Sequence, residues 1–102
     1  MNTKRWYNQN KDSLKKNFRI IDCIKKNQIK VSSILEIGCA NGFQLDFYGT
    51  ELKNKGLKKN LYGIDISNIA IKEGKKKYPK LNLYNIDSLK ISKLNKKLDL
   101  VI

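Results

Sequence analysis

The sequence predicts an α/β protein with an open sheet of parallel strands and helices on both faces. Short apolar runs, too brief for helices, recur along the chain, and stretches with helical spacing separate them. Near-continuous apolar character over a few residues is typical of strands buried on both faces. Strands that alternate with helices imply right-handed parallel crossovers. With 102 residues, the chain has room for one such domain.

The first 32 residues are expected to form a helical lead-in. Asp12 and Ser13 are both able to cap a helix in which apolar residues recur at helical spacing, and Lys25 and Lys26 suit its negative C-terminal end. The segment lacks the apolar core of a signal peptide, and no later stretch reaches the roughly 20 apolar residues of a membrane span. We therefore expect a cytoplasmic protein.

Residues 33–102 are expected to form the sheet. A helical stripe from Phe43 to Leu52, with Gly56 as a stop, follows the first apolar run, and Ser67 can cap a second helix that Pro79 ends. The four strand-like runs are SILEI (33–37), LYGID (61–65), LNLYNID (81–87) and LDLVI (98–102). The order strand, helix, strand, helix, strand favours a parallel sheet.

Three of these runs carry an acid at or near their end: Glu36, Asp65 and Asp87. Ligands of open parallel sheets bind at the carboxyl ends of the strands, so three carboxylates are expected on one rim. Each acid has an alternative role as a helix cap, for which Ser67 and Ser88 are nearby competitors. We favour the ligand role for all three acids.

The junction GCANG after the first run consists mostly of residues with small side chains. Gly38 and Gly42 flank the turn into the next helix, where a ligand can approach the backbone closely. The nicotinamide fingerprint G-x-G-x-x-G is not met, because Ala40 holds the position of the second glycine. Glu36 would repel the pyrophosphate of a dinucleotide, so the turn favours a cationic cofactor.

The stretch LEIGCANGFQL resembles the first motif of class I S-adenosylmethionine-dependent methyltransferases, acid-x-Gly-x-Gly-x-Gly. Glu36, Gly38 and Gly42 match, and Ala40 replaces the middle glycine. LYGIDISNIAIKEGKKKYP resembles the second motif of that family, NLYNIDSL the third and LDLVI the fourth. The resemblance extends from about residue 33 to residue 102.

This resemblance implies a three-layer Rossmann-like sheet that binds S-adenosylmethionine. It assigns the methionine portion of the cofactor to Glu36 and to the turn, the ribose hydroxyls to Asp65 and the adenine amino group to Asp87. The expected cofactor-binding residues are Glu36, Gly38, Cys39, Ala40, Gly42, Asp65, Ile66, Ile86 and Asp87. Family members normally continue beyond the fourth strand, so we expect these 102 residues to be the N-terminal part of a longer protein.

Neither the charge nor the cysteines indicate a different chemistry. The net charge is +13, but the lysines are spread along the chain, which favours solvated surfaces over an anionic partner. Cys23 and Cys39 lack the number and spacing of a metal site or a disulfide framework, so we expect reduced thiols and no metal. Cys39 has no histidine to activate it as a nucleophile.

The sequence therefore predicts a methyltransferase that acts on a small molecule. The alternatives are an RNA or protein methyltransferase, a cofactor-binding module without turnover and, least favoured, a nicotinamide dehydrogenase. Clustering of lysines on the cofactor rim would favour the RNA alternative. The residues do not indicate the methyl acceptor, a general base or the oligomeric state.

Overall fold

The computed structural model describes residues 3–52 and 56–102. The chain divides into two compact units, residues 1–30 and residues 31–102, which we describe separately. The first unit holds helix α1 (Thr3–Lys26). The second holds, in order, β1 (Ile34–Ile37), α2 (Phe43–Leu52), the 3₁₀ helix η1 (Leu57–Lys59), β2 (Leu61–Ile64), α3 (Asn68–Lys77), β3 (Asn82–Tyr84), the 3₁₀ helix η2 (Ser88–Leu94) and β4 (Leu100–Val101).

Helix α1 is longer than the sequence indicated. Asp12 and Ser13 lie inside it, so their prediction as N-terminal caps is wrong. Residues 3–11 contain no glycine or proline and several good helix formers, which lets the helix extend toward the N-terminus. At the other end Gln28 adopts a left-handed φ of 52°, and Ile29 N–H donates to the Ile24 carbonyl at 3.0 Å. This Schellman-type ending satisfies carbonyls of the last turn.

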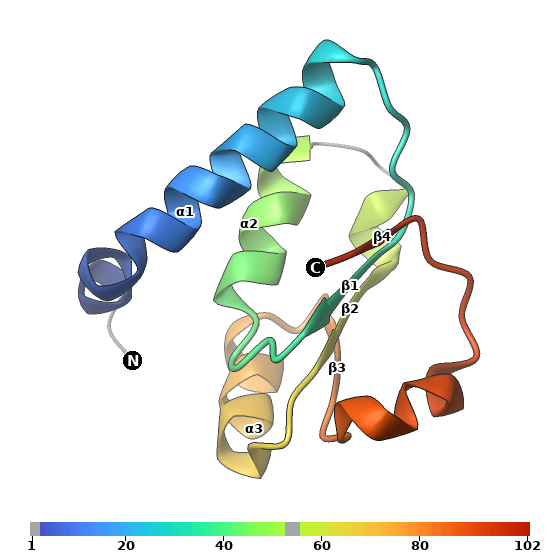
Figure 1. Cartoon of the computed structure of the whole chain (residues 1–102). Coiled ribbons are helices and arrows are strands. Elements are labelled where there is room, and N and C mark those ends of the chain that lie inside the picture. The colour runs from blue at the N-terminus through green and yellow to red at the C-terminus, as the bar shows by residue number, and fades with distance from the viewer. Residues whose placement is uncertain (1–2, 53–55) are drawn as a thin grey trace. The chain divides into compact units, whose positions relative to one another are not determined.

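The second unit is built on a parallel sheet, which confirms the predicted fold class. The strand order is β3-β2-β1-β4, and every pairing is parallel (Figure 1). The chain moves outward from β1 to β2 and β3, then returns to place β4 on the other side of β1. This reversal beside β1 is the position at which open α/β sheets bind ligands, outside the carboxyl ends of the strands.

Helices α2 and α3 cover one face of the sheet, and close contacts at glycines bring them near it (Figure 1). A Cβ built on Gly49 of α2 would lie 2.6 Å from the Leu61 side chain. A Cβ on Gly74 of α3 would lie only 2.5 Å from the Leu83 side chain. Ser67 caps α3, as predicted, by accepting a hydrogen bond from Ala70 N–H at 3.2 Å.

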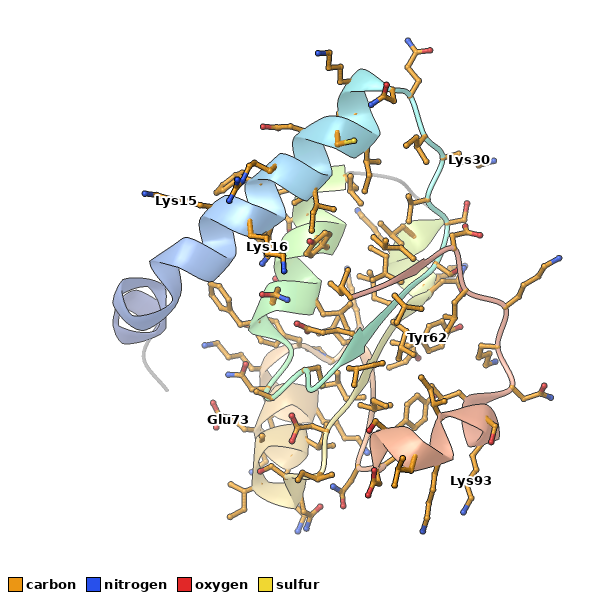
Figure 2. All side chains as sticks on the ribbon, in the orientation of Figure 1. Lys15, Lys16, Lys30, Tyr62, Glu73 and Lys93 are labelled. Carbon is orange, nitrogen blue, oxygen red and sulfur yellow. The ribbon has the colours of Figure 1, made fainter. Side chains whose placement is uncertain are left out.

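The opposite face is covered by η2, which makes the unit three-layered (Figure 1). Here Leu35, Tyr62 and Ile64 form a buried cluster, and Tyr62 points toward η2 (Figure 2). The partly buried apolar residues packed on this cluster are Tyr84, Ile86, Ile91, Leu94 and Leu98. A short 3₁₀ helix thus takes the place of a long covering helix on this face.

The strands are shorter than the apolar runs that predicted them, most clearly at β3. The predicted run reached residue 87, but Ile86 N–H turns back to the Tyr84 carbonyl at 3.1 Å, and Asn85 Nδ2 donates to the Asp65 carbonyl at 3.0 Å. The backbone therefore leaves the ladder after Tyr84. Of the helices in the two described ranges, none combines the length and apolar character that crossing a membrane requires.

Candidate functional site

A depression of about 130 Å³ opens at the carboxyl ends of β1, β2 and β3. It is lined by Ile37, Gly38, Ile64, Asp65, Ile66, Ile86 and Ser88. Four of these residues, Gly38, Asp65, Ile66 and Ile86, are among the predicted cofactor-binding residues. The parallel register brings them together from three separate strand ends.

Four of the five backbone amides of the glycine-rich turn, residues 38–42, already have acceptors inside the protein. The N–H groups of Gly38 and Cys39 both donate to the Ile64 carbonyl, at 2.9 and 3.0 Å. Ala40 N–H donates to Asp65 Oδ2 at 2.9 Å, and Gly42 N–H donates to the Cys39 carbonyl at 2.9 Å. With these donors engaged, the turn offers little to a phosphate, which binds to unpaired N–H groups.

The two glycines of the turn serve different purposes. Gly38 has φ +72°, and a Cβ built there would meet no atom within 4 Å, so the space beside it is open to a ligand. Gly42 has φ +92°, but a Cβ there would lie 2.7 Å from Leu81, so its missing side chain serves packing. Ala40 also has a left-handed φ of 49°, a conformation that costs an alanine about 1 kcal/mol or more.

Asp65 joins the ends of two elements through its carboxylate. Oδ2 accepts from Ala40 N–H, as described above, and Oδ1 accepts from Ser67 N–H at 2.7 Å. The side chain is partly exposed and also lines the depression. Local capping and ligand contact, which the sequence posed as alternatives, are therefore compatible at this residue.

Glu36 is buried and does not line the depression. It is 4% exposed, lies opposite Gly63 in the register, and its Oε2 accepts from Gln44 Nε2 at 2.6 Å. Its other oxygen, Oε1, is buried and has no hydrogen-bond partner among the residues that the structure describes. Burial raises the Glu36 pKa to about 8, against the lowering effect of the Gln44 and Leu45 hydrogen bonds. A buried carboxyl with one unused oxygen is the most unusual electrostatic feature of this unit.

Cys39 packs inside the domain instead of facing the depression. It is 4% exposed, and its sulfur occupies the space beside Gly63, where a built Cβ would come within 2.7 Å. Burial, together with the charges of Glu36 and Asp65, raises the Cys39 pKa to about 12. The thiol therefore stays protonated at neutral pH and is a packing group, not a nucleophile.

Asp87 caps η2 in this structure. Its Oδ1 accepts from Leu89 N–H at 3.0 Å, which is the capping role weighed against ligand binding for this acid. It is exposed and stands between two residues that line the depression, Ile86 and Ser88. Ile66 is 78% exposed, whereas Ile86 is partly buried in the cluster beneath η2.

The sequence did not indicate five residues that shape the site. Ile37, Ile64 and Ser88 line the depression. Gln44 holds the Glu36 carboxyl, and Asn85 ties the end of β3 to the end of β2. Ile37 and Ser88 adjoin predicted site residues, so their position at strand ends was a usable signal. The partnership of Gln44 and Glu36 depends on how α2 packs on the sheet, for which the sequence holds no local signal.

A scan against protein-family models finds no match for this chain, and a search of curated proteins finds none either. Among the side chains of residues 15–52 and 56–102, no group of three or more histidine, cysteine or acidic residues is placed to hold a metal ion.

Proposed function

We propose that this chain is an S-adenosylmethionine-dependent methyltransferase domain. The observation that carries the proposal is the buried Glu36 carboxyl with its unpartnered Oε1 at the end of β1. Open space beside Gly38, an acid at the end of β2 and an apolar-lined depression accompany it. Together these features suit a ligand that combines a positive charge, hydroxyl groups and an apolar ring.

The residues present fit such a cofactor. A cationic group near Glu36 would favour ionisation of the carboxyl and compensate for its burial. The Asp65 carboxylate lies on the wall of the depression, where it can accept hydrogen bonds from ribose hydroxyls. Ile66 and Ile86 provide apolar surface for the base. When bound, S-adenosylmethionine supplies a methyl group that its sulfonium already activates for transfer.

The protein's own contribution to the reaction would be positional. Gly38 leaves room for close approach, and the rigid strand ends hold the acids at set positions. Alignment of a nucleophile with the methyl group and exclusion of water account for most of what such a reaction requires. The methylated atom and a general base are not specified by the described side chains.

The occupied amides of the turn support this cofactor over a nicotinamide dinucleotide. A pyrophosphate needs N–H donors, and here those of Gly38, Cys39, Ala40 and Gly42 already have acceptors inside the protein. The Asp65 carboxylate on the wall of the depression would add repulsion. Isothermal titration with S-adenosylhomocysteine and with NAD distinguishes the two, and tighter binding of NAD would overturn the proposal.

The surroundings of the depression favour a small, uncharged acceptor. Ile37, Ile66, Ile69 and Leu89 are large apolar residues exposed in the segments that follow β1, β2 and β3. The segment after β1 carries no lysine through the end of α2, whereas Lys90 and Lys93 of η2 follow β3. Transfer of label from methyl-labelled cofactor to small molecules of a cell extract tests this, and labelling confined to RNA or protein would contradict it. Cofactor binding without any transfer would identify a non-catalytic module.

Asp65→Ala is expected to weaken the binding of S-adenosylhomocysteine roughly 10- to 100-fold, the usual effect of losing a hydrogen bond to a charged group. Titration calorimetry measures this change. Asp99→Ala is the matched control, because Asp99 Oδ2 accepts from Ser32 N–H at 2.8 Å, before β1, and does not line the depression. Equal affinities of Asp65→Ala and the unaltered chain would refute the ribose assignment.

A further inference from the structure

Charge is unevenly distributed over residues 31–102. The carboxyl ends of the strands carry Glu36, Asp65 and Asp87. The segments before β2 and β3 carry six exposed lysines, whereas η2, which follows β3, carries Lys90 and Lys93. Two acids of α2, Asp46 and Glu51, accompany the six lysines. We call these lysines the basic end; they are Lys58, Lys59, Lys75, Lys76, Lys77 and Lys80.

Two lysines of the basic end border a second cavity of about 200 Å³. Lys58 and Lys80 both line it, although they come from different connections. Its other lining residues are Asp46, Gly49, Thr50, Leu61 and Leu81. Asn82 Nδ2 donates to the Lys59 carbonyl at 3.1 Å, which links the two connections directly. The cavity lining therefore combines two lysines with the Asp46 carboxyl, the Thr50 hydroxyl and the apolar side chains of Leu61 and Leu81.

An aromatic ring lies close to this surface. Lys77 Nζ is 5.6 Å from the centroid of the Tyr78 ring. The charge of Asp46, which lines the cavity, contributes to the raised pKa of Tyr78, after burial as the main cause. Aromatic rings beside cationic grooves are typical of surfaces that bind single-stranded nucleic acids.

Helix electrostatics explain only part of this cluster. Lys75, Lys76 and Lys77 lie in the last turn of α3, where cations stabilise the helix dipole. Lys80 lies beyond that helix, and Lys58 belongs to a 3₁₀ helix of only three residues. The dipole of a long helix therefore does not explain why Lys58 and Lys80 lie beside the cavity.

We propose that the basic end binds the phosphodiester backbone of a single-stranded nucleic acid. Lysines contact phosphates as point charges, and residues 31–102 contain no arginine for bidentate reading of bases, so binding would be independent of sequence. An anionic membrane is less suitable, because membrane surfaces also take up apolar anchors. The large exposed apolar residues of the rim, Ile37, Ile66, Ile69 and Leu89, follow the strands instead of preceding them.

The proposal is independent of the cofactor site, and a double substitution tests it. Lys58→Gln/Lys80→Gln removes the two charges that line the cavity. The matched control is Lys90→Gln/Lys93→Gln in η2, where Lys93 projects away from the sheet (Figure 2). Fluorescence anisotropy with a labelled oligouridylate, repeated over a range of salt concentrations, measures the number of phosphate contacts.

We expect the slope of log K against log salt to become shallower by about 1.4 for Lys58→Gln/Lys80→Gln, roughly 0.7 for each lost contact. The control pair should change the slope far less, and both variants should bind S-adenosylhomocysteine like the unaltered chain. Equal slope changes in the two pairs, or no binding of the oligonucleotide, would overturn the proposal. If Lys58→Gln/Lys80→Gln weakened binding to phosphatidylserine vesicles more than binding to the oligonucleotide, the partner of the basic end would be a lipid surface instead.

Discussion

At the scale of single residues, two buried titratable groups at the junction of β1 and the turn have different chemical roles. Glu36 is a buried acid with an unused oxygen, whereas Cys39 is a buried thiol that fills space beside Gly63. Burial raises both pKa values, which leaves the thiol protonated at neutral pH and the carboxyl close to its titration point. Only Glu36 therefore responds to a cationic ligand in the neutral range.

The two cysteines should differ sharply in reactivity. At pH 8 we expect iodoacetamide to alkylate Cys23, which is exposed, and to leave Cys39 unmodified in the folded chain. Mass spectrometry after digestion measures both sites, and the same reaction in urea is the control that Cys39 can be alkylated once accessible. Rapid alkylation of Cys39 under native conditions would contradict its assignment as a packing residue.

At the scale of elements, the site depends on how closely α3 approaches the turn before α2. Asn41 Nδ2 donates to Glu73 Oε1 at 3.2 Å, and the Asn41 carbonyl lies against the backbone of Gly74. That hydrogen bond is the main cause of the lowered pKa of Glu73. Because α3 begins just after Asp65, this contact also sets the position of the acid relative to the turn.

Gly74→Ala should disturb this contact. The added Cβ would overlap the Asn41 carbonyl, closer than van der Waals contact allows, and overpacking of this kind costs about 1 to 3 kcal/mol. We expect a lower midpoint in urea denaturation, despite the better helix propensity of alanine. Unchanged stability of Gly74→Ala would disprove the close approach.

In Gly38→Ala the added Cβ meets open space, so the expected loss of stability is the cost of a left-handed backbone, about 1 to 2 kcal/mol. We also expect weaker binding of the proposed cofactor, because the Cβ occupies the space beside the turn.

At the scale of the whole molecule, buried and surface charges act differently. The surface carries an excess of positive charge that salt screens, whereas the buried Glu36 carboxyl is screened much less. Its pKa of about 8 in the folded chain, against 4.5 when unperturbed, makes global stability depend on pH. The folded chain keeps this proton where the unfolded chain releases it.

The free energy of unfolding should therefore fall as the pH rises from 4.5 to about 8. The stability from this group is fully present below 4.5 and is lost as the pH passes the folded pKa. Glu36→Gln removes that contribution, so its stability should decline less over the same range. Urea denaturation at several pH values measures both chains, and parallel profiles would show that Glu36 is ionised in the folded protein.

Much of the fold could be predicted from the sequence because its signals are local. The apolar runs identified all four strands, and Ser67 was confirmed as the cap of α3. The ends of elements were less accurate, since α1 begins before Asp12 and β3 stops at Tyr84. Those limits depend on hydrogen bonds between distant segments, such as the one from Asn85 to Asp65.

By itself, the sequence determined the alternation of strands and helices and therefore which residues meet at the carboxyl end of the sheet. Asp65 and Gly38 share that edge because parallel strands all end on one side. Only the tertiary structure decided that Glu36 keeps an unpartnered oxygen and that Lys58 and Lys80 line one cavity. The reason is physical: periodicity records which face a residue occupies, whereas hydrogen bonding and charge clustering depend on contacts between segments far apart in the chain.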